Sequence, residues 1–142
     1  MTPFKLHVIW GLILLIIGIV FDFLFVQGKI GQELVRANPP ALTSWAKELY
    51  DLTKFYLIVL GLLNIALALL LPYFTSTTRI DWTILGLMVI GPIFLIAAGI
   101  WYANAGPSYK WELRCTVLTV GLFAIVIGLG LELYKLLLTK NP

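Results

Sequence analysis

Four segments of the chain are each long and apolar enough to cross a lipid bilayer as a helix. The segments are Leu6–Val26, Phe55–Phe74, Trp82–Tyr102 and Cys115–Leu138. A spanning helix needs about 20 predominantly apolar residues, because the hydrocarbon core of a bilayer is about 30 Å thick. No water bonds the backbone inside that core, so apolar runs of this length form helices that satisfy their own polar groups. The pattern predicts an all-α, multi-pass integral membrane protein.

The composition of the chain excludes the soluble classes of protein. Of its 142 residues, 61% are hydrophobic and only 12% are charged, whereas soluble domains average about 45–50% apolar and about 25% charged residues. A chain of this length has too much surface for its volume to hide that much apolar area from water. A soluble enzyme and a disordered tail are therefore excluded. The ten basic residues are spread over several connections, so no nucleic-acid partner is expected.

The four segments occupy most of the chain, and this predicts one four-helix transmembrane bundle over residues 1–142. An even number of spans places both termini on the same side of the membrane. The second helix is expected to begin before its span, at about residue 45. The reason is that Trp45, Leu49, Leu52 and Tyr56 share one helical face.

The distribution of Lys and Arg bears on the orientation of the bundle. Six of these residues lie on the side of the first and third connections, and four lie on the side of the termini. Cytoplasmic loops carry an excess of Lys and Arg. An excess of two residues is too small to assign an orientation.

The first and fourth segments share a pattern of two glycines seven residues apart followed by an acid. The residues are Gly11, Gly18 and Asp22 in the first segment, and Gly121, Gly128 and Glu132 in the fourth. Glycines at this spacing lie on one stripe of a helix and allow a neighbouring backbone to approach closely. Each stripe is therefore expected to face a neighbouring helix. The shared pattern fits either an inverted internal repeat or a chance match between apolar segments.

Asp22 is the leading candidate for a functional polar residue, because ionisable groups inside a membrane are costly and are functional candidates by default. Lys54 and Arg114 stand at the starts of the second and fourth segments, on the same side of the bundle as Asp22. A cation there would pair with Asp22 and keep its carboxylate charged. Such a pair is either a structural bridge between helices or part of a substrate or proton site.

Aromatic and amide side chains gather on the same side of the bundle as Asp22, namely Trp101, Tyr102 and Asn104. They fit an interfacial aromatic belt, and with Asp22 they would line a site for a small ligand. Pro92 lies in the middle of the third segment and predicts a kink. Such a kink would open space beside this candidate site.

Two further polar residues lie within the segments. Glu132 has Lys135 one turn away, so snorkelling towards the interface and local pairing account for it. Asn64 is the deepest strongly polar side chain, and its ordinary role is a hydrogen bond between helices. A contact with a ligand is the alternative role for Asn64. Asp81 is expected to cap the third helix.

The chain has one histidine and one cysteine, which restricts cofactor chemistry. His7 offers one axial ligand for a haem or chlorophyll, but a single imidazole cannot make a bis-histidine site within the chain. Its position beside Lys5 at an interface favours a solvated side chain instead. The sequence has no spacing typical of a metal site or of nucleophilic catalysis. We therefore expect no metal and no cofactor, and a non-catalytic role is favoured.

Two hypotheses about function follow. In the first, the chain is a structural or accessory subunit of a larger membrane complex, in contact with lipids and with other membrane subunits or copies of itself. In the second, it is a small-ligand or lipid-binding protein, or a transporter, that uses the acidic and aromatic side near Asp22. An enzyme that relies on Asp22 and Glu132 ranks last.

Overall fold

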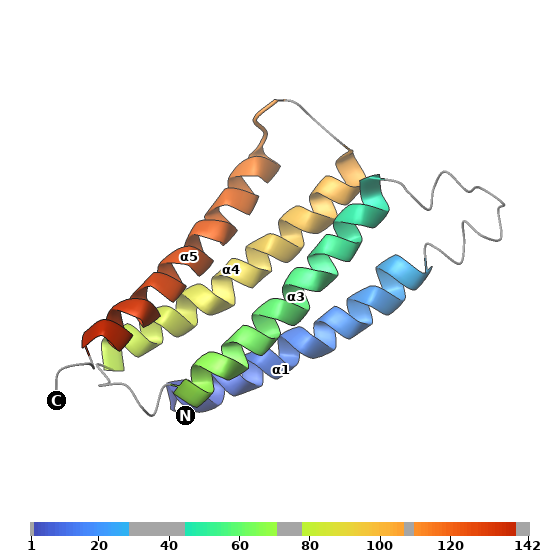
Figure 1. Cartoon of the computed structure of the whole chain (residues 1–142). Helices are drawn as coiled ribbons and strands as arrows, with labels where there is room; N and C mark the ends of the chain where they lie inside the picture. The colour runs from blue at the N-terminus through green and yellow to red at the C-terminus, as the bar shows by residue number, and fades with distance from the viewer. Residues whose placement is uncertain (1, 29–44, 71–77, 107–109, 139–142) are drawn as a thin grey trace.

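The computed structural model describes residues 2–28, 45–70, 78–106 and 110–138, and within these residues the ordered elements are all helical. The elements are α1 (Pro3–Phe21), η1 (Asp22–Gln27), α3 (Trp45–Leu70), α4 (Thr78–Ala105) and α5 (Leu113–Leu138). Figure 1 shows them as an antiparallel array in the order α1, α3, α4, α5. Helix α1 packs mainly on α3 and α5 mainly on α4, and the contact between α3 and α4 joins these two hairpins.

Four of the helical stretches are long and apolar enough to cross a membrane, which confirms that part of the expected fold. They are Pro3–Gln27, Trp45–Leu70, Arg79–Ala105 and Leu113–Lys135. The second helix is described over Trp45–Leu70, and its predicted start at about residue 45 stays a prediction because residues 29–44 lie outside the described residues. The third is helical from Thr78, ahead of the apolar segment that begins at Trp82. Residues 71–74, expected to end the second span, lie outside the described residues.

Glycine pairs set the close approach of the helices within each hairpin. A methyl group added at Gly11 would lie 2.7 Å from the carbonyl oxygen of Gly61, so α1 and α3 meet backbone to backbone. In the other hairpin, a methyl group added at Gly121 would lie 3.0 Å from the carbonyl oxygen of Gly91. Only a residue without a side chain permits such an approach. The expectation that both glycine stripes face a neighbouring helix is confirmed.

Helix α4 runs through Pro92 as one continuous element. Proline has no backbone N–H, so the carbonyl of Met88, four residues earlier, loses its normal partner in the helix. The indole Nε1–H of Trp10 donates a hydrogen bond to this carbonyl oxygen, with a donor–acceptor distance of 3.0 Å. A side chain of α1 thus satisfies the backbone group that the proline leaves without a donor.

Helix α1 ends in the π-helical segment η1, which the sequence pattern did not indicate. A π-turn is wider than an α-turn and changes the direction in which side chains point. The rings of Phe21 and Phe25 lie 4.7 Å apart here, and the ring of Tyr50 on α3 lies 5.3 Å from that of Phe25. The segment therefore packs its aromatic side chains against the first turns of α3.

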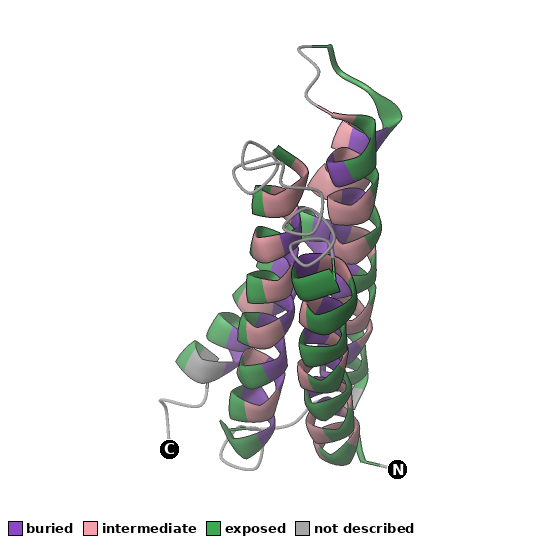
Figure 2. Ribbon diagram, turned by 90° about the vertical axis from the view of Figure 1, so that its right-hand side faces the viewer, coloured by how far each residue is buried: buried purple, intermediate pink, exposed green. Residues whose placement is uncertain are grey.

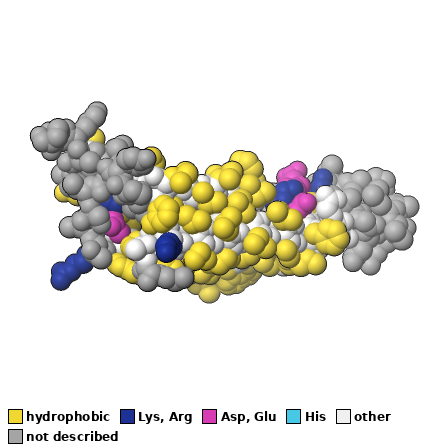
Figure 3. Space-filling model, turned by 90° about the horizontal axis from the view of Figure 1, so that it is seen from below, with side chains coloured by type: hydrophobic (Ala, Val, Ile, Leu, Met, Phe, Trp, Pro, Cys, Tyr) yellow, Lys and Arg dark blue, Asp and Glu magenta, His cyan; other side chains and the backbone are white. Residues whose placement is uncertain are grey.

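The surface of the molecule is apolar in its middle and charged towards its ends. Figure 3 shows hydrophobic side chains over the central part and charged side chains nearer the two ends. Figure 2 shows the buried residues on the faces that the helices turn towards one another and the exposed residues outside. Leu14, Ile84 and Met88 are fully buried in the core. Such an exterior suits lipid rather than water.

Candidate functional site

Asp22 pairs with Lys54, and this pair joins η1 to α3. The Lys54 ammonium lies 2.8 Å from Oδ1 of Asp22 and 3.3 Å from Oδ1 of Asp51, one turn away on α3. The side chains of Lys54 and Asp22 remain 27% and 31% exposed. An ion pair that is this accessible contributes about 0–1 kcal/mol to stability. Of the two cations expected near Asp22, Lys54 therefore provides the bridge.

Arg114 stabilises the junction between α4 and α5. Its Nε lies 2.8 Å from Oε2 of Glu112, and its Nη1 donates to the carbonyl oxygen of Gly106 at 2.7 Å. The guanidinium carbon also lies 4.7 Å from the centre of the Tyr102 ring, within the range of a cation–π contact. Gly106 has a φ of +75°, a conformation that glycine adopts without strain. The buried Arg114 thus links the end of α4 to the start of α5.

The aromatic and amide candidates make contacts of their own on this side of the bundle. The Tyr102 hydroxyl donates to Sγ of Cys115 at 2.7 Å, and the Tyr50 hydroxyl donates to Oδ1 of Asn104 at 3.0 Å. Trp101 is an exposed residue on α4. None of these contacts joins Tyr102 or Asn104 to Asp22, whose ion pair is with α3. The acidic and the aromatic parts of the predicted site therefore make separate contacts.

His7 and Asn64 form a buried hydrogen bond between α1 and α3. Nδ1 of His7 lies 3.0 Å from Oδ1 of Asn64, and because an amide oxygen only accepts, Nδ1 carries the proton. Nδ2 of Asn64 donates to the carbonyl of Leu60 at 2.9 Å. The solvated position expected for His7 is wrong, because its ring turns inward to Asn64 and is fully buried. Its Nε2 has no hydrogen-bond partner within the described residues.

Lys135 joins α5 to α4 through a buried ion pair with Asp81. Its Nζ lies 2.6 Å from Oδ1 of Asp81 and 3.6 Å from Oε2 of Glu132, and all three side chains are at most 7% exposed. The carboxylate oxygens of Glu132 have no hydrogen-bond partner among the described residues. Glu132 and Lys135 therefore pair locally as expected, but in the protein interior rather than by snorkelling outward.

The role expected for Asp81 as the cap of its helix is wrong. Helix α4 begins three residues earlier, at Thr78, and Asp81 lies within its first turn. A negative charge there is favoured by the helix dipole, and the side chain pairs with Lys135 of α5. As to metals, no group of three or more His, Cys, Asp and Glu side chains that could hold an ion occurs in the described part of the chain.

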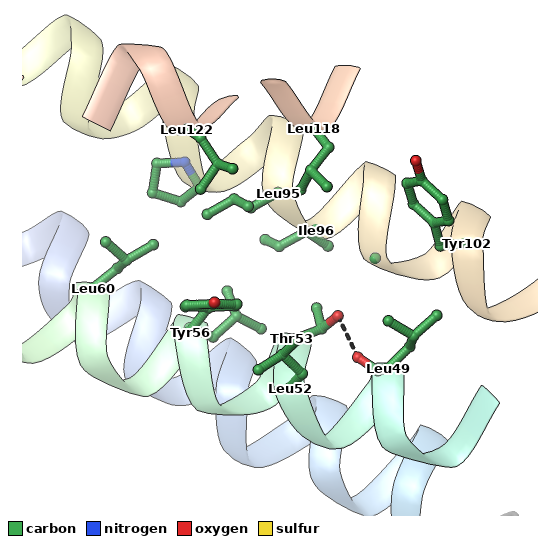
Figure 4. A pocket seen from close by; sticks show the side chains of 13 residues that line it. Leu49, Leu52, Thr53, Tyr56, Leu60, Leu95, Ile96, Tyr102, Leu118 and Leu122 are labelled. Carbon is green, nitrogen blue, oxygen red and sulfur yellow. Dashed lines mark hydrogen bonds between the residues drawn. The ribbon is translucent and has the colours of Figure 1, made fainter. Parts of the chain in front are cut away.

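An apolar cavity of about 150 Å³ lies between α3, α4 and α5, at the half of the bundle that contains Tyr102. Its lining extends from Leu49 to Leu60 on α3 and from Pro92 to Tyr102 on α4, and includes Leu118 and Leu122 on α5. Figure 4 shows these side chains converging from both hairpins. The Thr53 hydroxyl donates to the Leu49 carbonyl of its own helix at 2.7 Å, which leaves the lining almost wholly apolar.

Of the residues that line this cavity, the sequence predicted Tyr102 as a site residue and Pro92 as a kink that opens space beside the site, and it did not indicate the others as lining residues. No polar motif marks an apolar cavity, and the periodicity of a membrane helix does not tell which leucines meet across an interface. Cavities of about 150 Å³ lined by Leu, Ile and Phe stay dry and bind small apolar molecules. The cavity is therefore suited to a hydrocarbon group and not to an ion.

The features of this chain that bear on function are thus the polar clusters around Lys54, Arg114, His7 and Lys135 and the apolar cavity. The clusters join helices, and the cavity lies between the two hairpins. Comparisons with protein-family models, with curated proteins and with solved structures found no match to this chain. Its function is accordingly argued from its own residues.

Proposed function

We propose that this chain is a multi-pass integral membrane protein without catalytic activity that serves as a structural or accessory subunit of a larger membrane complex. The observation that carries this proposal is that charged side chains of the spans pair with one another between helices. Lys54 pairs with Asp22 between η1 and α3, and Lys135 pairs with Asp81 between α5 and α4. These pairs hold helices together, which is a structural role.

The outer face of α1 offers a surface on which another membrane helix would pack. Helix α1 belongs to the least buried of the four spans, and Ile9, Ile16 and Ile19 are exposed on it. Helices associate in membranes through close packing of such side chains. We propose that a partner subunit or a second copy of the chain covers this face, with lipid around the remainder.

The four spans also support the proposal that both termini lie on the same side of the membrane. The first turn of α1 and the last turn of α5 lie at the same end of the array in Figure 1. Labelling of a cysteine placed next to each terminus, in intact vesicles with an impermeant reagent, tests this topology. We expect the two positions to react in the same vesicle orientation; reaction in opposite orientations contradicts it.

The accessory role is tested by capturing the tagged full-length chain from its own membranes in a mild detergent. Native mass measurement and peptide identification then show what remains bound. We expect other membrane proteins in fixed stoichiometry with the chain. A lone monomer that carries only lipid or a small molecule would contradict the accessory role.

A second candidate function is the binding of a lipid or a small apolar ligand on the side of the first and third connections. The cavity between the hairpins favours it. Tyr102 contributes to the lining of this cavity, whereas Asp22 does not. The ligand would accordingly contact apolar side chains rather than the carboxylate.

A further inference from the structure

We infer that the cavity between α3, α4 and α5 holds a segment of one acyl chain of a bilayer lipid from the leaflet on the side of the first and third connections. This inference rests on the second candidate function and identifies its ligand. Four properties of the cavity carry it: its depth in the bundle, its opening, its lining and the charge around its outer end.

The lining of the cavity extends from the membrane surface into the middle of the bundle. On α3 it begins at Leu49, among the charged residues that precede the apolar segment from Phe55. On α4 it begins at Pro92, in the middle of the span Arg79–Ala105. The cavity thus extends from the membrane surface towards the middle of the bilayer.

The cavity opens sideways, towards lipid. Leu52 and Tyr56 on α3 and Leu122 on α5 line it and are 45%, 38% and 43% exposed. Leu57 and Leu95, which line it as well, are buried. Figure 4 shows that the lining side chains of α3 face those of α4 and α5 across the cavity. An acyl chain of a neighbouring lipid can therefore enter between α3 and α5 while its headgroup stays at the membrane surface.

The lining matches a hydrocarbon chain in its chemistry. The Thr53 hydroxyl bonds to its own helix, and the Tyr102 hydroxyl donates to Cys115. No charged side chain is part of the lining. Apart from the hydroxyl of Tyr56, the lining offers a polar ligand little to replace the hydrogen bonds to water that it would lose here, whereas an acyl chain has none to lose.

The charges near the outer end of the cavity are balanced, which bears on the headgroup. On the described residues of this side they are Lys47, Lys54, Lys110 and Arg114 against Asp22, Glu48, Asp51 and Glu112. Lys54 pairs with Asp22, and Arg114 pairs with Glu112. Among the described residues, these four positive and four negative charges leave no excess that would select an anionic lipid. The contact that the described residues offer is therefore with the acyl chain.

Photo-crosslinking of the full chain in lipid nanodiscs tests this inference. The probes are phosphatidylcholine and phosphatidylglycerol that each carry a diazirine on one acyl chain, and the labelled peptides are identified by mass spectrometry. We expect both lipids to label cavity residues of α3 and α5. Labelling of these residues by neither lipid would overturn the inference, because no acyl chain would then occupy the cavity.

Two substitutions on α5 provide the matched comparison. Leu118→Trp fills the cavity, and Val120→Trp places the same ring at an exposed position outside it. We expect Leu118→Trp to lower cavity labelling about tenfold, the effect of about two methylenes losing their burial, and Val120→Trp to leave it unchanged. The smaller change Leu122→Phe keeps the test valid if Leu118→Trp does not fold. Unchanged labelling in the cavity-filling variants overturns the inference.

Native mass measurement of the same samples distinguishes a failure of the acyl-chain inference from a failure of the ligand-binding function on which it rests. A bound apolar molecule other than a lipid that displaces the probe from the cavity overturns the acyl-chain inference and leaves ligand binding in place. No cavity labelling and no bound apolar molecule would contradict both.

Discussion

The indole Nε1 of Trp10 donates a hydrogen bond to the carbonyl oxygen of Met88 at a distance of 3.0 Å, and this carbonyl is the one that Pro92 leaves without a backbone donor. The bond links α1 to the middle of α4, although the two helices belong to different hairpins. A proline in a membrane helix is tolerated when a neighbour satisfies the freed carbonyl. Trp10 supplies that neighbour here.

Trp10→Phe is expected to destabilise the protein by about 1–3 kcal/mol, because it leaves the buried Met88 carbonyl without a donor. The effect should shrink in a Pro92→Ala background, where residue 92 has an N–H that bonds to this carbonyl. Reversible unfolding of the purified protein in mixed detergent micelles measures both costs. Trp82→Phe, at an exposed tryptophan, is the control. Equal costs of Trp10→Phe in the two backgrounds would rule out this pairing.

The two interhelical ion pairs are expected to differ in energy because they differ in burial. Lys135→Met removes the cation shared by two buried carboxylates, Asp81 and Glu132, and should cost about 3–5 kcal/mol. Lys54→Met removes the cation of a pair that is about a quarter to a third exposed and should cost about 0–1 kcal/mol. The same unfolding measurement compares them. If Lys54→Met costs as much free energy of unfolding as Lys135→Met, or more, burial does not determine the energies of the two ion pairs.

The hydrogen bond between His7 and Asn64 is expected to show as a coupling energy. His7→Phe and Asn64→Leu each leave the other polar group buried without its partner, whereas the double variant removes both. The coupling between the two substitutions should be about 0.5–1.5 kcal/mol, as for hydrogen bonds between membrane helices. A double-mutant cycle on the free energy of unfolding measures it. Strict additivity would mean that the bond contributes nothing.

The glycine contact between α1 and α3 predicts opposite effects for two chemically identical changes. Gly11→Ala introduces a methyl group 2.7 Å from the Gly61 carbonyl oxygen, and a methyl group at Gly130 meets nothing within 4 Å. Gly11→Ala should cost about 1–3 kcal/mol through overpacking. Gly130→Ala should be neutral or stabilise by up to about 1 kcal/mol, since it favours the helix. Thermal unfolding in detergent ranks the two variants, and destabilisation by Gly130→Ala alone would reverse the expected order.

The sequence was sufficient to predict the helical segments and the glycine stripes at which neighbouring helices approach closely. Helical length and hydropathy identify the spans because the bilayer imposes a minimum apolar length. The spacing of Gly11 and Gly18 indicated a contact stripe because residues seven apart share a helix face.

Pairings between distant residues could not be predicted in the same way. Asp81 and Lys135 are 54 positions apart, and nothing in either segment indicates which face meets which neighbour. The sequence predicted a solvated His7 beside Lys5, because it does not show that the ring turns towards Asn64. The cavity near Tyr102 was missed for a related reason, because it arises from a gap between hairpins whose lining resembles any other apolar surface.

The most direct test of the accessory role measures the native mass of the chain captured from its own membranes, with and without a polar residue on α1. Ile16→Asn changes the exposed face of α1, and Val126→Asn makes a similar change on the exposed face of α5. We expect the original chain and Val126→Asn to be recovered with partner membrane proteins, and Ile16→Asn to be recovered without them. Recovery of the unchanged chain as a monomer with lipid alone would contradict the account.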